Sequence, residues 1–328
     1  MKLFLYNYLD KWYLKKINFW RIDMFKLLDN IIEANRKWTE YGKVASYIPA
    51  LNNSNPDKLG ICITTLDGEE YFSGDWEEKF TIQSISKVIT LMLALIDNDK
   101  ERVFSKVGVE PTADAFNSII TLETKNDQKP LNPMINAGAI ATVALINGKD
   151  GEETFNRILN FTKKITGNEH IGINAEVYNS ERTTGNRNRA LAYFMKDAGV
   201  IEPNVEEVLD VYFKQCSMEC NCRDISRIGA ILANDGAIPW NGERVIPKQV
   251  SRIVKTIMVT CGMYDASGQF AVDIGVPAKS GVGGGILGSA PGRLGIGVFG
   301  PALDKKGNSL AGIKVMEELS KELDLSIF

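Results

Sequence analysis

Hydrophobic and polar positions in the first part of the chain include runs typical of β-strands, followed by a longer apolar run. Two short β-rich runs between residues 60 and 72 flank Leu66-Asp67-Gly68-Glu69, an Asp-Gly turn that predicts a β-hairpin. An apolar run from Val88 to Ile96 follows and predicts a buried helix that begins near Ser84. Upstream, an amphipathic pattern begins at Met24, which we interpret as a first helix and as a candidate start of the protein.

The middle of the chain, from about residue 104 to residue 237, changes to helical spacing with almost no strand signals. The pattern is clearest in 205–216, where apolar residues recur at i, i+3, i+4 and i+7. Gly167 and Gly199 stand where helices are expected to end, because glycine is favoured just after a helix. We therefore predict an inserted all-helical lobe over 104–237.

Strand patterns return after Met258, at 269–274, 280–287 and 294–299, and a helix is expected over 309–323. Short glycine and proline turns between them favour an antiparallel sheet with helices packed on it. The fold class is thus α/β in the α+β arrangement. The sheet lobe comprises 24–103 and 238–328, and 1–23 is an extension of uncertain order within a chain that otherwise forms one catalytic domain.

Composition indicates a folded protein that acts on a small molecule. The 328 residues are 44% hydrophobic and 24% charged, and 38 basic against 41 acidic residues give a formal charge of -3 without a basic block. A nucleic-acid binder is therefore not expected. No apolar stretch approaches the roughly 20 residues of a membrane span, and no export signal is apparent, so we expect no membrane contact.

Cysteine and histidine content restricts the possible chemistry. Five cysteines, an odd number, are typical of reduced thiols in the cytoplasm, where we expect the protein to reside. Cys216, Cys220 and Cys222 lack the Cys-x-x-Cys spacing of zinc sites and have no nearby histidine, so no metal is predicted. The single histidine, His170, lies in a polar stretch and is expected on the surface, so lysine or tyrosine must supply any catalytic base.

Ser84 and Lys87 are the strongest catalytic candidates. They lie one turn apart at the predicted start of a helix, where a partly desolvated lysine can be a neutral amine that activates serine. Ser-x-x-Lys alone is a weak signal, and its position at a helix start strengthens it. Lys279-Ser280-Gly281 follows much later and is similar to the third motif of the serine β-lactamases and transpeptidases, which lies on an edge strand.

Three longer motifs make the resemblance specific. The chain carries Phe80-Thr81-Ile82-Gln83-Ser84-Ile85-Ser86-Lys87, Asn132-Pro133-Met134-Ile135-Asn136-Ala137-Gly138-Ala139-Ile140 and Lys279-Ser280-Gly281-Val282-Gly283-Gly284-Gly285. In these motifs, and from about Ile31 to the C-terminus, it resembles the serine-dependent glutaminases. The resemblance implies a β-lactamase/transpeptidase-like fold, hydrolysis of L-glutamine to L-glutamate and ammonia, no cofactor, and a homodimer or homotetramer.

The resemblance also implies roles for individual residues. Ser84 would be the nucleophile, Lys87 its base and Tyr264 the group that relays a proton to the leaving ammonia, with Ser84 and Val282 supplying the oxyanion-hole amides. The substrate-binding residues implied are Tyr47, which would close over the amide, Glu181 for the ammonium group, and Asn136, Asn188 and Tyr212 for the carboxylate end, together with Ser84, Tyr264 and Val282.

Taken locally, most of these residues also have a plain structural interpretation. Glu181 lies in a charged stretch, Asn188 has the type of a helix cap, Tyr212 is on the apolar face of its helix, and Tyr264 has the type of a loop tyrosine. Asn136 differs, because a polar residue amid Ile135 and Ala137 needs a buried partner.

Two alternative functions remain at this point. A β-lactamase or penicillin-binding-type acyl-serine hydrolase shares the Ser-x-x-Lys pair, although we find no Ser-Asp-Asn triplet between the first and third motifs and no export signal. A non-catalytic glutamine-binding module would retain the fold with a broken dyad, whereas both Ser84 and Lys87 are present. We therefore predict a glutaminase that works through a Ser84 glutamyl-enzyme.

Overall fold

The computed structural model describes residues 23–112, 117–124 and 128–328. The first described element is a helix over 23–36, followed by the short 3₁₀ helices η1 (Lys37–Tyr41) and η2 (Pro49–Asn53). The predicted extension 1–23 lies outside the described residues except for its last residue, so its order and a start at Met24 stay predictions. Among the helices within the described ranges, none has the length and apolar character to cross a bilayer.

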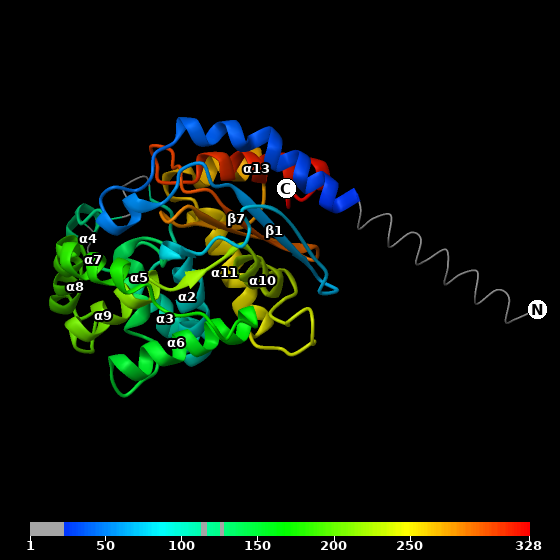
Figure 1. The fold of residues 1–328 in the computed structure, drawn as a ribbon. Coiled ribbons are helices and arrows are strands. Elements are labelled where there is room, and N and C mark those ends of the chain that lie inside the picture. The colour runs from blue at the N-terminus through cyan, green and yellow to red at the C-terminus, as the bar shows by residue number, and fades with distance from the viewer. Residues whose placement is uncertain (1–22, 113–116, 125–127) are drawn as a thin grey trace, which may run out of the picture.

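A five-stranded antiparallel sheet is built from both ends of the chain (Figure 1). Its order is β2-β1-β7-β6-β5, with bounds β1 (Gly60–Thr65), β2 (Glu70–Gly74), β5 (Ala278–Ser280), β6 (Gly285–Ala290) and β7 (Leu294–Phe299). The predicted hairpin is β1–β2, and β1 also pairs with β7, with Ile61 opposite Val298. The predicted antiparallel sheet with helices around it is confirmed.

Alternation along the strands assigns side chains to two cores. Ile61 and Ile63 face one core together with the helix 23–36, α12 (Ser267–Asp273) and α13 (Leu310–Leu323). Cys62, between them, faces the other core, where α2 (Ser86–Asp97) and α10 (Cys222–Ala233) contribute their apolar side chains. Figure 1 shows the helix 23–36 and α13 together on one side of the sheet, and α2, α10 and α11 on the other.

Glycines allow α10 to lie directly against the sheet. A Cβ atom on Gly297 would lie 2.0 Å from the carbonyl oxygen of Cys222, and one on Gly229 would lie 2.1 Å from the carbonyl oxygen of Gly288. Both distances are shorter than any real contact, so no side chain fits at either position. This close approach holds the sheet and α10 at a fixed separation.

α2 is buried along nearly its whole length, and eight further helices complete the described part of the chain. They are α3 (Lys100–Lys106), α4 (Ile120–Thr124), α5 (Asn136–Val143), α6 (Gly151–Thr166), α7 (Ala175–Thr184), α8 (Asn186–Asp197), α9 (Val205–Cys216) and α11 (Lys248–Cys261). The helix predicted over 205–216 is confirmed as α9, and Gly167 and Gly199 follow α6 and α8 with positive φ as predicted. Because α10 falls within 104–237 and yet packs on the sheet, the lobe boundaries stay a prediction.

Two strand predictions in the C-terminal part are wrong. Residues 269–274 belong largely to α12, where Phe270 and Ile274 are buried one turn apart while Val272 between them is 83% exposed, a helical pattern. Residues 280–287 do not form one strand, because a glycine turn at 281–284 separates β5 from β6. The glycines that interrupt the apolar pattern there form this turn.

Candidate active site

The segment before α2 turns sharply at Gln83. It runs from β3 (Phe80–Thr81), which pairs with β4 (Glu219–Cys220), through the 3₁₀ turn η3 (Gln83–Ile85) into α2. Gln83 has a φ of 48°, a left-handed conformation that costs a non-glycine residue about 1–3 kcal/mol. This turn places the side chain of Ser84, the predicted nucleophile, on the wall of a cavity.

Ser86, the other hydroxyl of the motif, has a structural role. It is fully buried, and its Oγ donates a hydrogen bond to the carbonyl oxygen of Gln83 at 2.7 Å. Nε2 of Gln215 lies 3.3 Å from the same hydroxyl. Ser86 is thus directed away from the cavity and stabilises the turn that carries Ser84.

Lys87 is fully buried, with an exposed fraction of 0%. Its Nζ donates to Oδ1 of Asn136 at 2.7 Å and to the carbonyl oxygen of Met134 at 3.2 Å. Burial lowers the pKa of Lys87 to about 8, against smaller opposing effects of Cys216 and Glu181. A neutral amine one turn from Ser84 is therefore accessible near physiological pH.

Tyr264 approaches Ser84 from the opposite part of the chain. It lies in the 3₁₀ turn η4 (Tyr264–Ala266) with a φ of 55°, and its side chain is hydrogen-bonded with that of Ser84. Its hydroxyl also donates to the carbonyl oxygen of Ser280 at 3.3 Å. Burial raises the pKa of Tyr264, so its hydroxyl keeps its proton and can donate it.

Lys279, in the third motif, lies against the ring of Tyr264. It is 0% exposed, its Nζ lies 4.3 Å from the centre of the Tyr264 ring, and it donates to the carbonyl oxygens of Gly262 and Ser280. Burial, and then the charge of Lys87, lower the pKa of Lys279 well below its usual value. The site therefore has two amines of lowered basicity, Lys87 one turn after Ser84 and Lys279 beside the ring of Tyr264.

The glycine turn at 281–284 lies against the segment that precedes Ser84. A Cβ atom on Gly281 would lie 2.6 Å from the carbonyl oxygen of Ile82, and one on Gly283 would lie 2.3 Å from that of Thr81. Only glycine fits at both positions. Val282, between them, lines the same cavity as Ser84.

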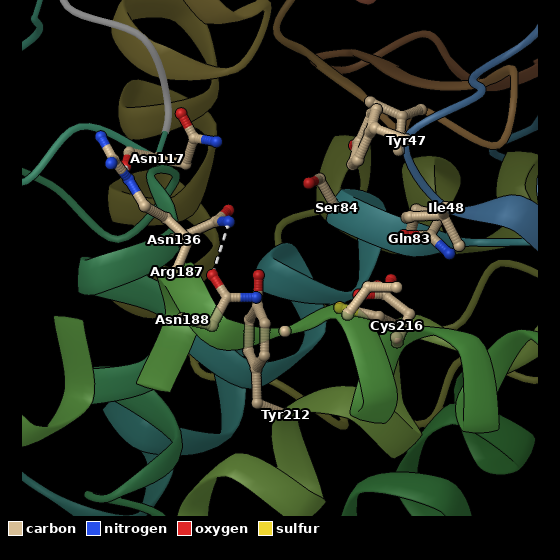
Figure 2. A pocket seen from close by; sticks show the side chains of 14 residues that line it. Tyr47, Ile48, Gln83, Ser84, Asn117, Asn136, Arg187, Asn188, Tyr212 and Cys216 are labelled. Carbon is tan, nitrogen blue, oxygen red and sulfur yellow. Dashed lines mark hydrogen bonds between the residues drawn. The ribbon is translucent and has the colours of Figure 1, made fainter. Parts of the chain in front are cut away.

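The cavity at Ser84 has a volume of about 110 Å³. Seven of the eight predicted substrate-binding residues line it: Tyr47, Ser84, Asn136, Glu181, Asn188, Tyr212 and Val282. The eighth, Tyr264, is outside this lining and reaches the site through its contact with Ser84. Figure 2 shows Tyr47 and Ile48 on one side of the cavity, and Asn117 and Arg187 on the other.

Glu181, on α7, is a buried carboxylate in the cavity wall. Burial raises its pKa to about 7, while a hydrogen bond from Gln83 and the charge of Lys87 oppose the rise. Among the described lining residues Arg187 is the only one with a basic side chain, and its Nε donates to the carbonyl oxygen of Asn117 at 2.9 Å. The described lining thus offers a carboxylate, and a cation at the rim of the cavity, to a small ligand.

Asn136, Asn188 and Tyr212 come from three helices, α5, α8 and α9. Nδ2 of Asn136 donates to Oδ1 of Asn188 at 3.0 Å, the dashed line in Figure 2, so the partner expected for Asn136 is present. Asn188 lies inside α8 and does not cap a helix. Tyr47 is 56% exposed and lies within a segment whose Ala45, Ile48 and Leu51 pack with Val282.

Several lining residues were not assigned to the cavity from the sequence: Ile48, Gln83, Asn117, Thr184, Gly185, Arg187 and Cys216. Gln83 was within a motif, and its position directly before Ser84 was a usable signal. Arg187 precedes Asn188 in a stretch with several charges, so its sequence context did not distinguish it from ordinary surface residues. Asn117 and Cys216 carried no local signal, since only the fold brings them to the cavity.

The cysteine cluster and His170 were the other candidates considered from the sequence. Cys216, Cys220 and Cys222 are buried free thiols, and within the described ranges no group of three or more His, Cys, Asp or Glu residues is arranged to hold a metal ion. Burial raises the pKa of Cys216 to about 12, so this thiol is protonated at neutral pH. His170 is exposed in a turn, as predicted.

Comparison with known proteins gives one consistent result. The family model named Glutaminase matches residues 42–328. A glutaminase of Clostridium botulinum (strain Kyoto) is 66% identical over 305 residues, 93% of this chain and 100% of that protein, and glutaminase 2 of Clostridium perfringens (strain 13) is 64% identical over the same shares.

Solved structures agree with the sequence relatives. A Bacillus glutaminase crystallised in 4.3 M NaCl is 43% identical, with a TM-score of 0.86 over 92% of this chain and 98% of that one. A Bacillus subtilis glutaminase in covalent complex with 5-oxo-L-norleucine, formed from 6-diazo-5-oxo-L-norleucine, is 42% identical, with a TM-score of 0.85 over 93% and 99%. The expected β-lactamase-like fold is consistent with these matches. The chain belongs to the glutaminase family.

Proposed function

We propose that this protein hydrolyses the side-chain amide of L-glutamine through a glutamyl ester on Ser84, with Lys87 as the base. Membership of the glutaminase family makes it an amidohydrolase that acts on glutamine. The observation that carries the mechanism is the buried Lys87, whose pKa burial lowers to about 8, one helical turn from a serine in the cavity wall.

In the first half-reaction Ser84 Oγ attacks the side-chain carbonyl carbon while neutral Lys87 takes its proton. The backbone amides of Ser84 and Val282 stabilise the negative oxygen of the tetrahedral intermediate, and the close glycine turn at 281–284 supports that arrangement. Tyr264 delivers a proton to the departing nitrogen as the carbon–nitrogen bond breaks. Its contact with Ser84 supports this role, and its hydroxyl carries the proton at neutral pH.

In the second half-reaction a water molecule attacks the ester carbonyl and the bond to Ser84 breaks, which releases L-glutamate. The same two groups act in reverse order, since the water loses a proton and Ser84 regains one. No cofactor takes part in this scheme.

Recognition of glutamine uses the opposite wall of the cavity. Glu181 pairs with the α-ammonium group, which restores its charge in a site where burial alone disfavours that charge. Asn136, Asn188 and Tyr212 bind the carboxylate end, and the exposed Tyr47 covers the amide end. The Bacillus subtilis relatives bound to a 6-diazo-5-oxo-L-norleucine-derived ligand support an amino acid of this size as the occupant.

Residence in the cytoplasm and assembly into a homodimer or homotetramer belong to the same proposal. Five buried free thiols support a reducing compartment. Oligomeric state is measured directly by light scattering on the purified protein.

The deciding experiment measures ammonia release by wild type, Ser84→Ala and Lys87→Ala. L-glutamine, L-asparagine and a chromogenic β-lactam are the substrates. We expect release selective for glutamine, and a loss of about 10⁴-fold or more in kcat in both variants, because the nucleophile and its base act as one unit. Circular dichroism of the wild type and both variants is the control for damage to the fold.

Near-wild-type turnover by Ser84→Ala with a matched spectrum would overturn the mechanism. Cleavage of the β-lactam alone would instead favour a β-lactamase-type hydrolase. No turnover of any of the three substrates by the wild type would favour a glutamine-binding module.

A further inference from the structure

Tyr264 is the one predicted binding residue that does not line the cavity at Ser84. It lines a second cavity instead, with a volume of about 20 Å³. The described residues around the second cavity include Thr112, Asn132, Met134, Thr260, Cys261 and Tyr264. The mechanism above gives this cavity no role, although Tyr264 connects it to the proposed nucleophile.

The second cavity lies next to both groups that move protons in the proposed mechanism. Tyr264 forms part of its wall, and its hydroxyl donates to the carbonyl oxygen of Ser280 at 3.3 Å. Met134 is also in the wall, and its carbonyl oxygen accepts a hydrogen bond from Nζ of Lys87 at 3.2 Å. A small molecule in the second cavity is therefore in contact with Tyr264 and one residue away from Lys87.

The size and polarity of the second cavity fit one water molecule. A cavity needs roughly 10–15 Å³ to hold a water, and the water needs two to four polar partners. The polar residues in the wall are Thr112, Asn132, Thr260 and Tyr264. Asn132 is 1% exposed and held in place, since its Nδ2 donates to the carbonyl oxygen of Glu110 at 2.8 Å. L-glutamine is too large for a volume of about 20 Å³.

The second cavity extends from the interior of the protein toward its surface. Met134 and Cys261 are buried, whereas Thr260, next to Cys261 near the end of α11, is exposed. Oγ1 of Thr260 and Sγ of Cys261 lie 3.2 Å apart, so the two side chains form a continuous part of the wall. Water entering past Thr260 does not pass Tyr47, which lines the cavity at Ser84.

The second half-reaction needs a source of water of this kind. At that stage the glutamyl group is held as an ester on Ser84 and by its charged groups at the recognition wall, so it occupies the main cavity. By microscopic reversibility, the water attacks from the position that ammonia has left, beside the proton donor Tyr264. The second cavity borders this same tyrosine.

We propose that the second cavity binds the water molecule that hydrolyses the glutamyl ester and delivers it past Tyr264. The proposal rests on the proposed function, since it needs the ester on Ser84. The water oxygen forms a bond to the ester carbonyl carbon, and the bond from that carbon to Ser84 Oγ breaks. Tyr264, which gave its proton to ammonia, takes one from the water, and protonated Lys87 returns one to Ser84 Oγ.

Thr260→Phe tests the proposal by narrowing the second cavity at its exposed end. Delayed entry of water slows hydrolysis of the ester but not its formation, and kcat/KM reports only the steps up to formation of the ester. We therefore expect kcat and KM for L-glutamine to fall together, by about tenfold, with kcat/KM unchanged. Glutamyl-enzyme should accumulate, which is measured as a burst of ammonia and as a mass increase of the acid-quenched protein.

Cys261→Met narrows the same cavity at its buried end and should give the same changes. Thr256→Phe is the matched control. Thr256 is an exposed threonine one turn before Thr260 on α11, and both hydroxyls donate to the carbonyl oxygen four residues earlier. Thr256 does not line the second cavity, so we expect the wild-type kcat and KM.

Wild-type kcat and KM in both Thr260→Phe and Cys261→Met would overturn the proposal. A fall in kcat/KM in both variants without accumulation of glutamyl-enzyme would also refute it, because the damage would then lie in the first half-reaction. Failure of the proposed function is distinguishable from either result, since the wild type itself would then show no Ser84-dependent release of ammonia.

Discussion

The two walls of the cavity are built in different ways. The reaction wall takes its proposed nucleophile and base from one helical turn, Ser84 to Lys87, and adds Tyr264 from η4. The recognition wall takes one residue each from separate helices, including Glu181 from α7 and Tyr212 from α9. A short motif can therefore encode the chemistry, whereas recognition of the substrate depends on the whole arrangement of the helices.

Burial acts on both walls with opposite sign. It lowers the pKa of Lys87 to about 8 and raises that of Glu181 to about 7, so each group is pushed toward its neutral form. A neutral amine is what the reaction wall needs before substrate arrives. A carboxylate that regains its charge against an incoming ammonium group is what the recognition wall needs when it arrives.

The largest effect that would sharpen this comparison is expected from Tyr264→Phe. Loss of the hydroxyl removes the proton donor to the leaving ammonia, so kcat should fall about 10²–10⁴-fold. KM should change little, since the ring and its contact with Lys279 remain. Steady-state kinetics on L-glutamine measure both, with Tyr41→Phe, an exposed tyrosine, as the control. An equal rise in KM would place Tyr264 on the recognition side instead.

A smaller effect, confined to the other wall, is expected from Glu181→Gln. Loss of one partner of a buried charge pair costs about 2 kcal/mol or more, which corresponds to roughly thirtyfold in kcat/KM for L-glutamine. N-acetylglutamine lacks the charged group, so its kcat/KM should be nearly unaffected. Glu176→Gln, an exposed acid on the same helix, is the control. An unchanged ratio between the two substrates would contradict the pairing.

The same division between the walls explains what the sequence could predict. The hairpin at β1 and β2, the helix over 205–216 and the Ser84/Lys87 pair follow from local period and spacing, and the structure has them there. Glu181, Asn188 and Tyr212 had plausible local interpretations as surface, cap and core residues. Only resemblance to a family singled them out, because their proximity is a product of tertiary packing.

Local pattern also failed where one segment fits two periods. In 269–274 the apolar residues alternate, which is compatible with a strand, yet Phe270 and Ile274 are also one helical turn apart. The chain adopts the helix, Gly275 ends it with a positive φ, and Val272 is left exposed. Contact with the core formed by the sheet and α13 decides this choice, and no window of six residues contains that information.

The smallest expected effect is a change in the shape of the pH profile. The proposed mechanism requires neutral Lys87 and ionised Glu181, so kcat/KM should rise as pH increases through about 7 and about 8. At lower pH the slope of log kcat/KM against pH should approach two in the wild type. In Glu181→Gln it should approach one, because only Lys87 still titrates. Identical slopes in the two proteins would show that ionisation of Glu181 does not govern binding. A kcat/KM profile that is flat from below pH about 7 to above pH about 8 would show that Lys87 is not the base. Titration alone therefore distinguishes the two walls. Burial favours the neutral forms of both Lys87 and Glu181, but the proposed mechanism uses the neutral form of Lys87 only.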